Sequence, residues 1–171
     1  LWHKNTSPPH VLVMTATPIP RSLALSLYGE MSVSTIDELP NGRQPITTVL
    51  VEEEQIETVY QSMADELSAG HQIYYVLPLI ESSEHMEQIE NVLEVSDKLR
   101  ARFPNYQVDV LHGQLDKTEQ QVVMESFGNN QTQILVATTM VEVGVDVANV
   151  TVIVIQSAER FGLAQLHQLR G

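Results

Sequence analysis

The sequence predicts an α/β fold, a parallel β-sheet flanked by helices, from three observations. Short runs of β-favouring apolar residues alternate with stretches of helical periodicity between residues 46 and 155. Two of these runs, 134–137 and 150–155, are almost wholly apolar, as expected of strands that are covered on both faces. Polar or glycine-containing segments follow the predicted strands, at the carboxyl ends where ligands gather in open α/β sheets.

Composition limits the classes of protein that the chain can represent. Its 171 residues, 43% of them hydrophobic, are enough for one ordinary core. No apolar run approaches the roughly 18 residues of a membrane span, and no signal-like start is present, so we expect a cytoplasmic protein without a membrane partner. Cysteine is absent and the six histidines form no His-Glu-x-x-His pair, so no metal site is expected.

The charge argues against an independent nucleic-acid-binding protein. The net charge is −13, with only nine lysines and arginines. Affinity for DNA usually depends on basic groups that displace counterions from the phosphates. Either the chain does not bind DNA, or it supplies a small contact strip while other domains supply the positive charge.

Residues 1–45 contain too few elements for a domain. A strand at 11–14 runs into Thr15 and Thr17, and a short helix at 22–28 ends at Gly29. One strand and one helix cannot bury their own apolar faces, so we expect residues 1–35 to be the end of a preceding domain. The proline, glycine and acidic residues of 36–45 predict an interdomain linker. Because the chain starts without methionine and stops inside a helix-like run, we expect a fragment.

The regular alternation begins after this linker. A strand is predicted at 46–51, a helix that stops at Gly70, a second strand at 72–77 and a second helix at 84–103 that ends before Pro104. The apolar face of the first helix is expected to carry Ile56, Val59, Tyr60, Met63 and Leu67.

Three more strands complete the predicted sheet, at 107–111, 134–137 and 150–155. Between the first two, Asp116 and Glu119 have the spacing of a capping box at the start of a helix. The strand at 107–111 leads into His112 and Gly113. Since parallel strands end on one edge, residues that are distant in sequence should meet there.

The strand at 134–137 is followed at once by Thr138 and Thr139. Hydroxyls at this position are well placed to hold a phosphate, and we expect both to be open on the same edge as His112. Gly144 permits a tight turn, and its neighbours Glu142 and Asp146 are able to accept from sugar hydroxyls or backbone donors. The alternative is an ordinary strand end with solvated acids.

Four motifs in this order resemble superfamily-two DNA helicases. They are Met14-Thr-Ala-Thr-Pro-Ile-Pro-Arg21, Leu111-His-Gly113, Val136-Ala-Thr-Thr139 with Glu142-x-Gly-x-Asp146, and Glu159-Arg-Phe-Gly-Leu-Ala-Gln-Leu-His-Gln-Leu-Arg-Gly171. The set is most similar to the branch-migration helicases that remodel stalled replication forks and Holliday junctions in DNA repair and recombination. Transcription-repair coupling translocases share the first and last runs and remain the alternative.

The resemblance implies two RecA-like domains with ATP and Mg²⁺ in the cleft between them and branched DNA across their upper edge. Residues 1–35 would end the first motor domain, and residues 46–171 would form the second as far as motif VI. The first motor domain and a wedge domain would be partners in the same chain, and the protein would be monomeric.

The resemblance also implies a role for single residues. It implies catalytic coupling for Thr15, Thr17, Gln168 and Arg170. It implies contact with the nucleotide for Gly144 and Asp146, and with the DNA backbone for His112, Gly113, Thr138 and Thr139.

Several parts of such a motor are not in this sequence. No glycine is followed by lysine, so a Gly-x-x-x-x-Gly-Lys phosphate loop is missing, and the arginines expected after Gly171 lie beyond it. We therefore expect the fragment alone to be inactive and to bind no cofactor tightly. A RecA-like module that docks a partner protein without nucleotide chemistry is the competing hypothesis. A small-molecule hydrolase is disfavoured because no Gly-x-Ser-x-Gly elbow is present.

Overall fold

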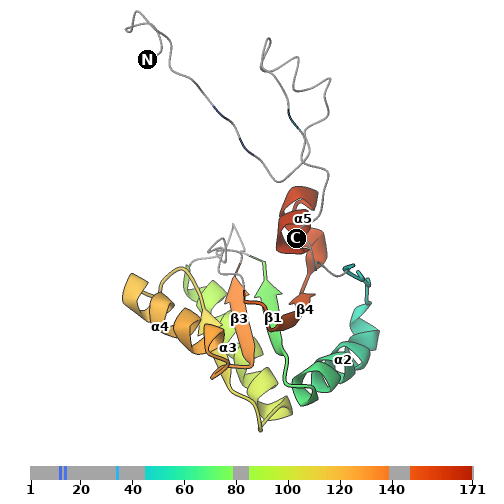
Figure 1. Ribbon diagram of the computed structural model, residues 1–171, viewed down its shortest axis with the longest axis horizontal. Helices are drawn as coiled ribbons and strands as arrows, with labels where there is room; N and C mark the ends of the chain where they lie inside the picture. Colours follow the sequence, from blue (N-terminus) through green and yellow to red (C-terminus); the bar gives the residue numbers. More distant parts are fainter. Residues whose placement is uncertain are drawn as a thin grey trace, which may run out of the picture. The chain divides into compact units, whose positions relative to one another are not determined.

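The computed structural model describes residues 45–78, 85–138 and 147–170, together with Leu12, Met14 and Ser34. One compact unit spans Thr47–Gly162, and α5 (Leu163–Arg170) belongs to another. The elements of the first unit are η1 (Glu53–Gln55), α2 (Ile56–Ser68), β1 (Gln72–Leu77), α3 (His85–Arg102), β2 (Val108–Leu111), α4 (Lys117–Gly128), β3 (Ile134–Thr138), β4 (Val150–Ile155) and η2 (Ala158–Arg160) (Figure 1).

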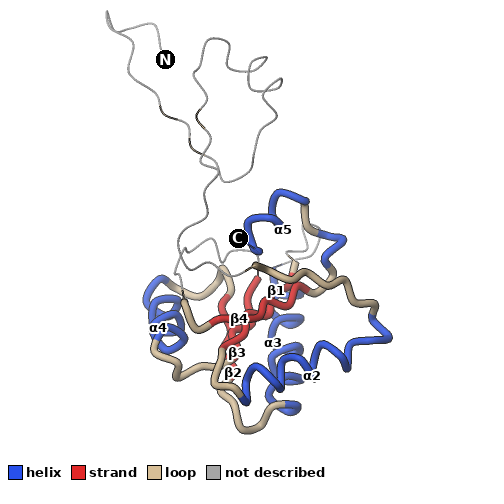
Figure 2. The backbone as a smooth tube through the Cα atoms, turned by 45° about the vertical axis from the view of Figure 1, so that its right-hand side comes forward, coloured by secondary structure: helices blue, strands red, loops and turns tan. Residues whose placement is uncertain are grey.

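The four described strands form one parallel sheet in the order β2-β3-β1-β4. Side chains alternate between the two faces of a strand. Helices α2 and α3 share a hydrophobic cluster with Ile73 and Tyr75, whereas α4 shares another with Leu135 and Ala137. Figure 2 shows the strands between α4 on one side and α2 and α3 on the other. The predicted parallel sheet flanked by helices is confirmed.

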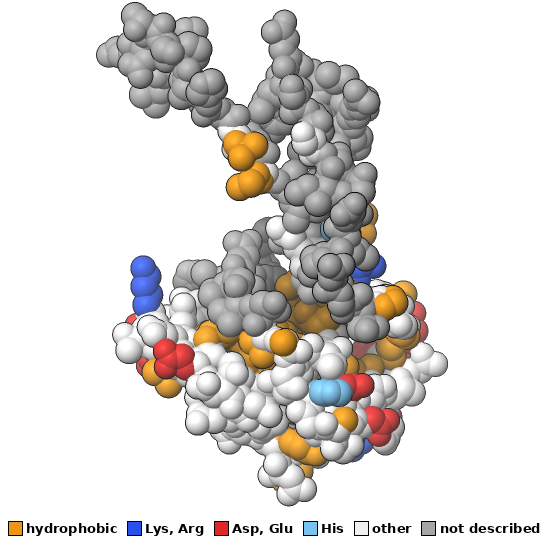
Figure 3. Space-filling view, viewed as in Figure 1, with side chains coloured by type: hydrophobic (Ala, Val, Ile, Leu, Met, Phe, Trp, Pro, Cys, Tyr) orange, Lys and Arg blue, Asp and Glu red, His pale blue; other side chains and the backbone are white. Residues whose placement is uncertain are grey.

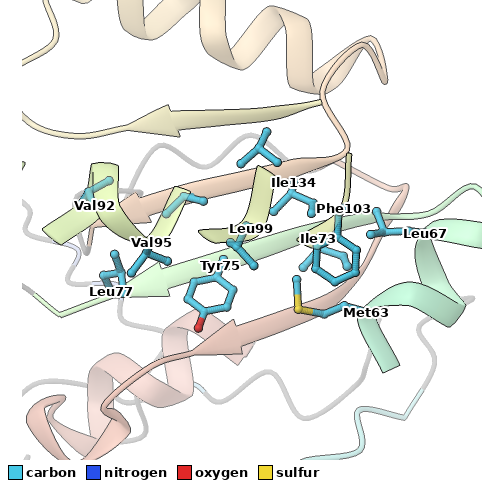
Figure 4. Close-up of a cluster of buried hydrophobic side chains, with 12 residues drawn as sticks. Met63, Leu67, Ile73, Tyr75, Leu77, Val92, Val95, Leu99, Phe103 and Ile134 are labelled. Atoms are coloured by element: carbon cyan, nitrogen blue, oxygen red, sulfur yellow. The ribbon is translucent and has the colours of Figure 1, made fainter. Parts of the chain in front are cut away.

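The larger cluster lies under α2 and α3 (Figure 4). Met63 and Leu67 from α2 meet Leu99 from α3 and Phe103, the residue after α3, over the strand residue Ile73. All five are nearly inaccessible to solvent. Four of the five positions predicted for the apolar face of the first helix thus belong to this cluster or pack against it, namely Val59, Tyr60, Met63 and Leu67.

Local signals in the sequence predict several helix ends correctly. The Asp116 carboxylate accepts from the N–H groups of Thr118 and Glu119, both at 2.8 Å, and the Glu119 carboxylate accepts from the Asp116 N–H at 2.9 Å. This is the predicted capping box, which satisfies donors that α4 leaves unpaired. Gly70, the predicted stop of α2, has a φ of 88°, a conformation that glycine adopts at little cost.

The predicted strand at 46–51 is wrong in this structure. Residues 45–52 have no regular secondary structure. Ile46, Val49 and Leu50 are 48%, 71% and 83% exposed, so the segment contributes little packing. A strand requires a neighbour with free backbone groups, and β-propensity alone does not supply one. The remaining elements agree with the predictions within one residue at their ends, apart from those that extend outside the described residues.

The amino edge of the sheet carries a carboxylate with two donors. Glu66 accepts from His71 Nδ1 and from Thr151 Oγ1, each at 2.6 Å. The Thr151 hydroxyl and then His71 lower the pKa of Glu66 below its ordinary value of 4.5. A depressed pKa in the folded state means stability that is present above pH 4.5 and is lost as pH falls through the folded value.

We therefore predict that Glu66→Gln changes how the unfolding temperature of the chain depends on pH. The difference between the wild type and the variant should be largest near neutrality and shrink as pH falls below 4.5. Thermal unfolding at a series of pH values measures it. Glu54→Gln, at an exposed position in η1, is the control and should follow the wild type. A difference that stays constant down to about pH 3 contradicts the linkage.

Candidate nucleic-acid interface

The carboxyl ends of β2, β3 and β1 lie side by side. Leu111 pairs with Ala137 and Leu77 pairs with Thr138, all in parallel register. His112 follows β2 directly, so it leaves the sheet next to Thr138. The structure thus brings His112, Gly113 and Thr138 to the same edge. We call these three residues the β2–β3 edge.

A tight turn follows β2. The Leu115 N–H donates to the His112 carbonyl at 3.2 Å, and the Gln114 N–H donates to His112 Nδ1 at 3.3 Å. Because Nδ1 accepts, this arrangement assigns the ring proton to Nε2, which is left as a donor. His112 is half-buried and Gly113 is exposed. The turn therefore presents an imidazole donor and a stretch of unobstructed backbone.

Thr138 ends β3 with its side chain inside the protein. The residue is 4% exposed, and its Oγ1 is the only buried side-chain nitrogen or oxygen in the described part of the chain without a hydrogen-bond partner. An unpaired buried hydroxyl costs about 1–3 kcal/mol. Such a group is unusual in a folded protein and calls for a partner. A hydroxyl at the carboxyl end of a strand is able to donate a hydrogen bond to the oxygen of an incoming phosphate.

This burial corrects one expectation. Thr138 lies on the same edge as His112, as predicted, but its hydroxyl is covered rather than open. The strand continues through Thr138, one residue longer than predicted, so the side chain takes a core position. A ligand therefore reaches this hydroxyl only if the residues that cover it at the β2–β3 edge move.

A hollow of about 710 Å³ lies beside the β2–β3 edge. It extends along α4 from His112 and Gly113 to the helix end. Leu111 and Met124 supply apolar surface. The other lining residues are Lys117, Gln120, Gln121, Glu125, Gly128 and Asn129. Among the described side chains, Figure 3 shows few from Lys or Arg on the face in view, consistent with the negative net charge.

Helix α5 carries the two remaining described candidates, Gln168 and Arg170. Both side chains are exposed. They are two positions apart and so point to different sides of the helix. Arg170 forms no ion pair with another described residue, so its guanidinium is available for a phosphate or carboxylate.

The other predicted site residues, Thr15, Thr17, Thr139, Gly144, Asp146 and Glu142, lie outside the described residues. Within the described ranges, no cluster of three or more acidic or histidine side chains is arranged to hold a metal ion. None of the helices described combines the length and apolarity needed to cross a membrane.

Comparison with known proteins places this geometry in context. Residues 54–171 match the family described as the helicase conserved C-terminal domain. Over 162 residues the chain is 50% identical to the ATP-dependent DNA helicase RecG of Staphylococcus epidermidis. The aligned region covers 95% of this chain and 24% of the relative. The RecG of Staphylococcus aureus matches with the same identity and the same coverage.

A solved structure of RecG bound to a three-way DNA junction matches with a TM-score of 0.72 and 41% identity. The match covers 91% of this chain and 20% of that one. The chain thus spans about a quarter of the length of the curated relatives. The resemblance to DNA helicases that the motifs predicted is confirmed.

Proposed function

The chain belongs to the helicase conserved C-terminal domain family, and from this premise we propose that it is part of an ATP-dependent DNA helicase that remodels branched DNA. Residues 46–171 form its second RecA-like motor domain, residues 36–45 a linker and residues 1–35 the end of the first motor domain. The parent protein acts as a monomer in the cytoplasm on stalled forks and Holliday junctions, in DNA repair and recombination.

The orphaned Thr138 hydroxyl carries the proposal. It lies next to the His112–Gly113 turn, where an imidazole N–H and exposed backbone converge. Hydroxyls and main-chain N–H groups are ordinary ligands of the DNA backbone, and they hold phosphates without reading the base sequence. Such contacts require little positive charge from this domain, which reconciles DNA binding with a net charge of −13.

ATP, bound with Mg²⁺ between the two motor domains, supplies the free energy for movement. We assign Gly144 and Asp146 to its ribose side and Thr15 and Thr17 to the link between the nucleotide cleft and DNA. The exposed Gln168 and Arg170 fit a phosphate by their chemistry. Closure of the cleft shifts the β2–β3 edge and Thr139 relative to the first domain, and the duplex advances.

DNA-dependent ATP hydrolysis tests this function. A protein of the relatives' length that contains this chain should hydrolyse ATP faster when forked DNA is added, and the stimulation should fall with salt. The 171-residue chain alone should not hydrolyse ATP. Absence of stimulation by forked, junction and linear DNA at low salt contradicts the proposal.

A protein-docking module is the second candidate, favoured by the acidic charge and by the hollow along α4. The two functions differ in one measurement on the isolated chain. Weak DNA binding that declines steeply with salt supports the helicase fragment. A complete lack of response to forked DNA, combined with tight binding to another protein, supports the module.

A further inference from the structure

Lysine and arginine are scarce in the unit that holds the sheet, and most of them are already paired. Residues 47–162 contain five, namely Lys98, Arg100, Arg102, Lys117 and Arg160. The three on α3 each form an ion pair with a carboxylate, at 2.7 Å for Lys98 and 2.8 Å for Arg100. Lys117 and Arg160 are exposed and form no ion pair with any described residue. These two cations are therefore available to a ligand.

Both available cations lie at the carboxyl edge of the sheet. Lys117 is the first residue of α4, and it lines the same hollow as His112 and Gly113, which follow β2. Arg160 ends η2, within one turn of the end of β4. Figure 1 shows the arrowheads of β1, β3 and β4 directed toward the same edge. Since β2 and β4 are the outer strands of the described sheet, the two cations lie at the two ends of that edge.

Arg160 is anchored by the turn that contains it. The Gln156 N–H donates to the Val76 carbonyl and the Arg160 N–H donates to the Ser157 carbonyl, both at 3.0 Å. Ser157 is left-handed, with φ 52° and ψ 50°, a conformation that a residue with a Cβ keeps where its surroundings impose it. Phe161, directly after Arg160, is buried. The backbone is therefore held on both sides of Arg160, while the residue itself is exposed.

Lys117 occupies a position that is unfavourable for a cation. The first turn of a helix carries a partial positive charge, which repels a lysine and favours an acid. The helical neighbours three and four residues on, Gln120 and Gln121, carry no charge that could pair with it. The carboxylates of Asp116 and Glu119 accept from backbone N–H groups in the capping box. A residue that breaks a local rule without a compensating contact is typical of a binding site.

We propose that Lys117 and Arg160 bind two phosphates of one DNA backbone that crosses the carboxyl edge of the sheet from β2 to β4. This inference rests on the proposed function and adds two DNA contacts to it. The buried Thr138 hydroxyl, which has no partner, ends β3 between the two outer strands and independently indicates a ligand at this edge.

The width of the sheet fits such a backbone. Three strand spacings separate β2 from β4, a distance of about 14 Å. One strand of B-form DNA carries about four phosphates over this length. A DNA backbone that runs across the strands therefore presents separate phosphates to Lys117 and Arg160.

The test uses the longer protein that contains this chain and measures how much forked DNA gives half-maximal stimulation of ATP hydrolysis at a series of salt concentrations. Lys117→Gln and Arg160→Gln should each raise the required DNA concentration about threefold to tenfold at about 0.1 M salt. Each should also reduce the slope of log affinity against log salt by about 0.9, and the double variant by about 1.8. The kcat at saturating DNA and the KM for ATP should stay within about twofold of the wild type.

Lys98→Gln is the matched control, because it removes the same charge from an exposed lysine whose partner is Glu94. It should keep the wild-type salt slope, and so should Lys117→Arg, which retains the charge. Lys117→Gln should leave the unfolding temperature unchanged or raised, because the helix loses a cation from its positive end. Weaker DNA binding by this variant would then not result from unfolding.

Wild-type salt slopes in both single variants overturn the inference. A changed slope in only one of them also overturns it, since the DNA would then not cross the whole edge. A fall in kcat of Arg160→Gln at saturating DNA assigns Arg160 to ATP and contradicts its role as a DNA contact. A wild type whose ATP hydrolysis does not respond to forked DNA overturns the proposed function, whereas a stimulated wild type with unaffected variants overturns this inference alone.

Discussion

Replacing Thr138 with valine should lower DNA-stimulated ATP hydrolysis by a factor of about 10 to 100 and yet stabilise the isolated chain. Valine keeps the shape of the side chain and removes only the hydroxyl, which is buried and has no partner. Removing an unpaired buried polar group recovers about 1 kcal/mol or more of its desolvation cost. A hydrogen bond to a charged phosphate contributes about 1.5–3 kcal/mol, which corresponds to the expected loss in rate.

Thr132→Val is the matched control for this variant. Thr132 is fully buried in the same α4–β3 region, but its hydroxyl donates to the Asp109 carboxylate. Its loss should destabilise the chain by about 1–2 kcal/mol and leave DNA-stimulated turnover unchanged. Urea unfolding of the chain and ATPase assays of the longer protein measure both quantities. Loss of stability in Thr138→Val, or unchanged turnover, contradicts a hydroxyl reserved for a ligand.

Replacing Gln72 with leucine should destabilise the chain by about 3–5 kcal/mol, a large share of the stability of a small domain. Gln72 is completely buried at the start of β1. Its Nε2 donates to the carbonyls of Phe127 and Thr132 at 2.7 and 2.6 Å, and its Oε1 accepts from Asn149 at 3.1 Å. Leucine has similar volume, so the main effect is to leave these groups without partners.

Urea unfolding of the 171-residue chain measures this loss as a lower midpoint. Gln61→Leu serves as the control. Gln61 is an exposed residue of α2 whose amide donates to the Asp65 carboxylate of the same helix, so the change should alter stability by about 0.5 kcal/mol or less. A Gln72→Leu variant with the wild-type midpoint would show that the three bonds contribute nothing net. That result would contradict a stabilising role for Gln72 in joining Phe127, Thr132 and Asn149.

The sequence predicted those features that depend on local pattern. The capping box of Asp116, the stop at Gly70 and the apolar strand at 134–137 are determined by neighbours within a few residues. The sequence also predicted that His112 and Thr138 lie on one edge, because the carboxyl ends of parallel strands meet there. The prediction of a strand at 46–51 was wrong, because a strand forms only beside a neighbouring strand that its own residue pattern does not specify.

Other features had weak signals or none. Nothing local marks Ser157 as left-handed, since serine has no preference for that region comparable to that of glycine or asparagine. The burial of Thr138 depends on where β3 ends, and strand ends are the least predictable part of an element. Gln72 carried one usable signal: a polar side chain that opens an apolar parallel strand is buried and must find partners.

The most direct test of the account is a structure of the longer protein bound to forked DNA. The account predicts a phosphate oxygen about 3 Å from Thr138 Oγ1, with a neighbouring phosphate at the His112–Gly113 turn. DNA that passes over another surface while the Thr138 hydroxyl stays buried and unpaired would contradict it.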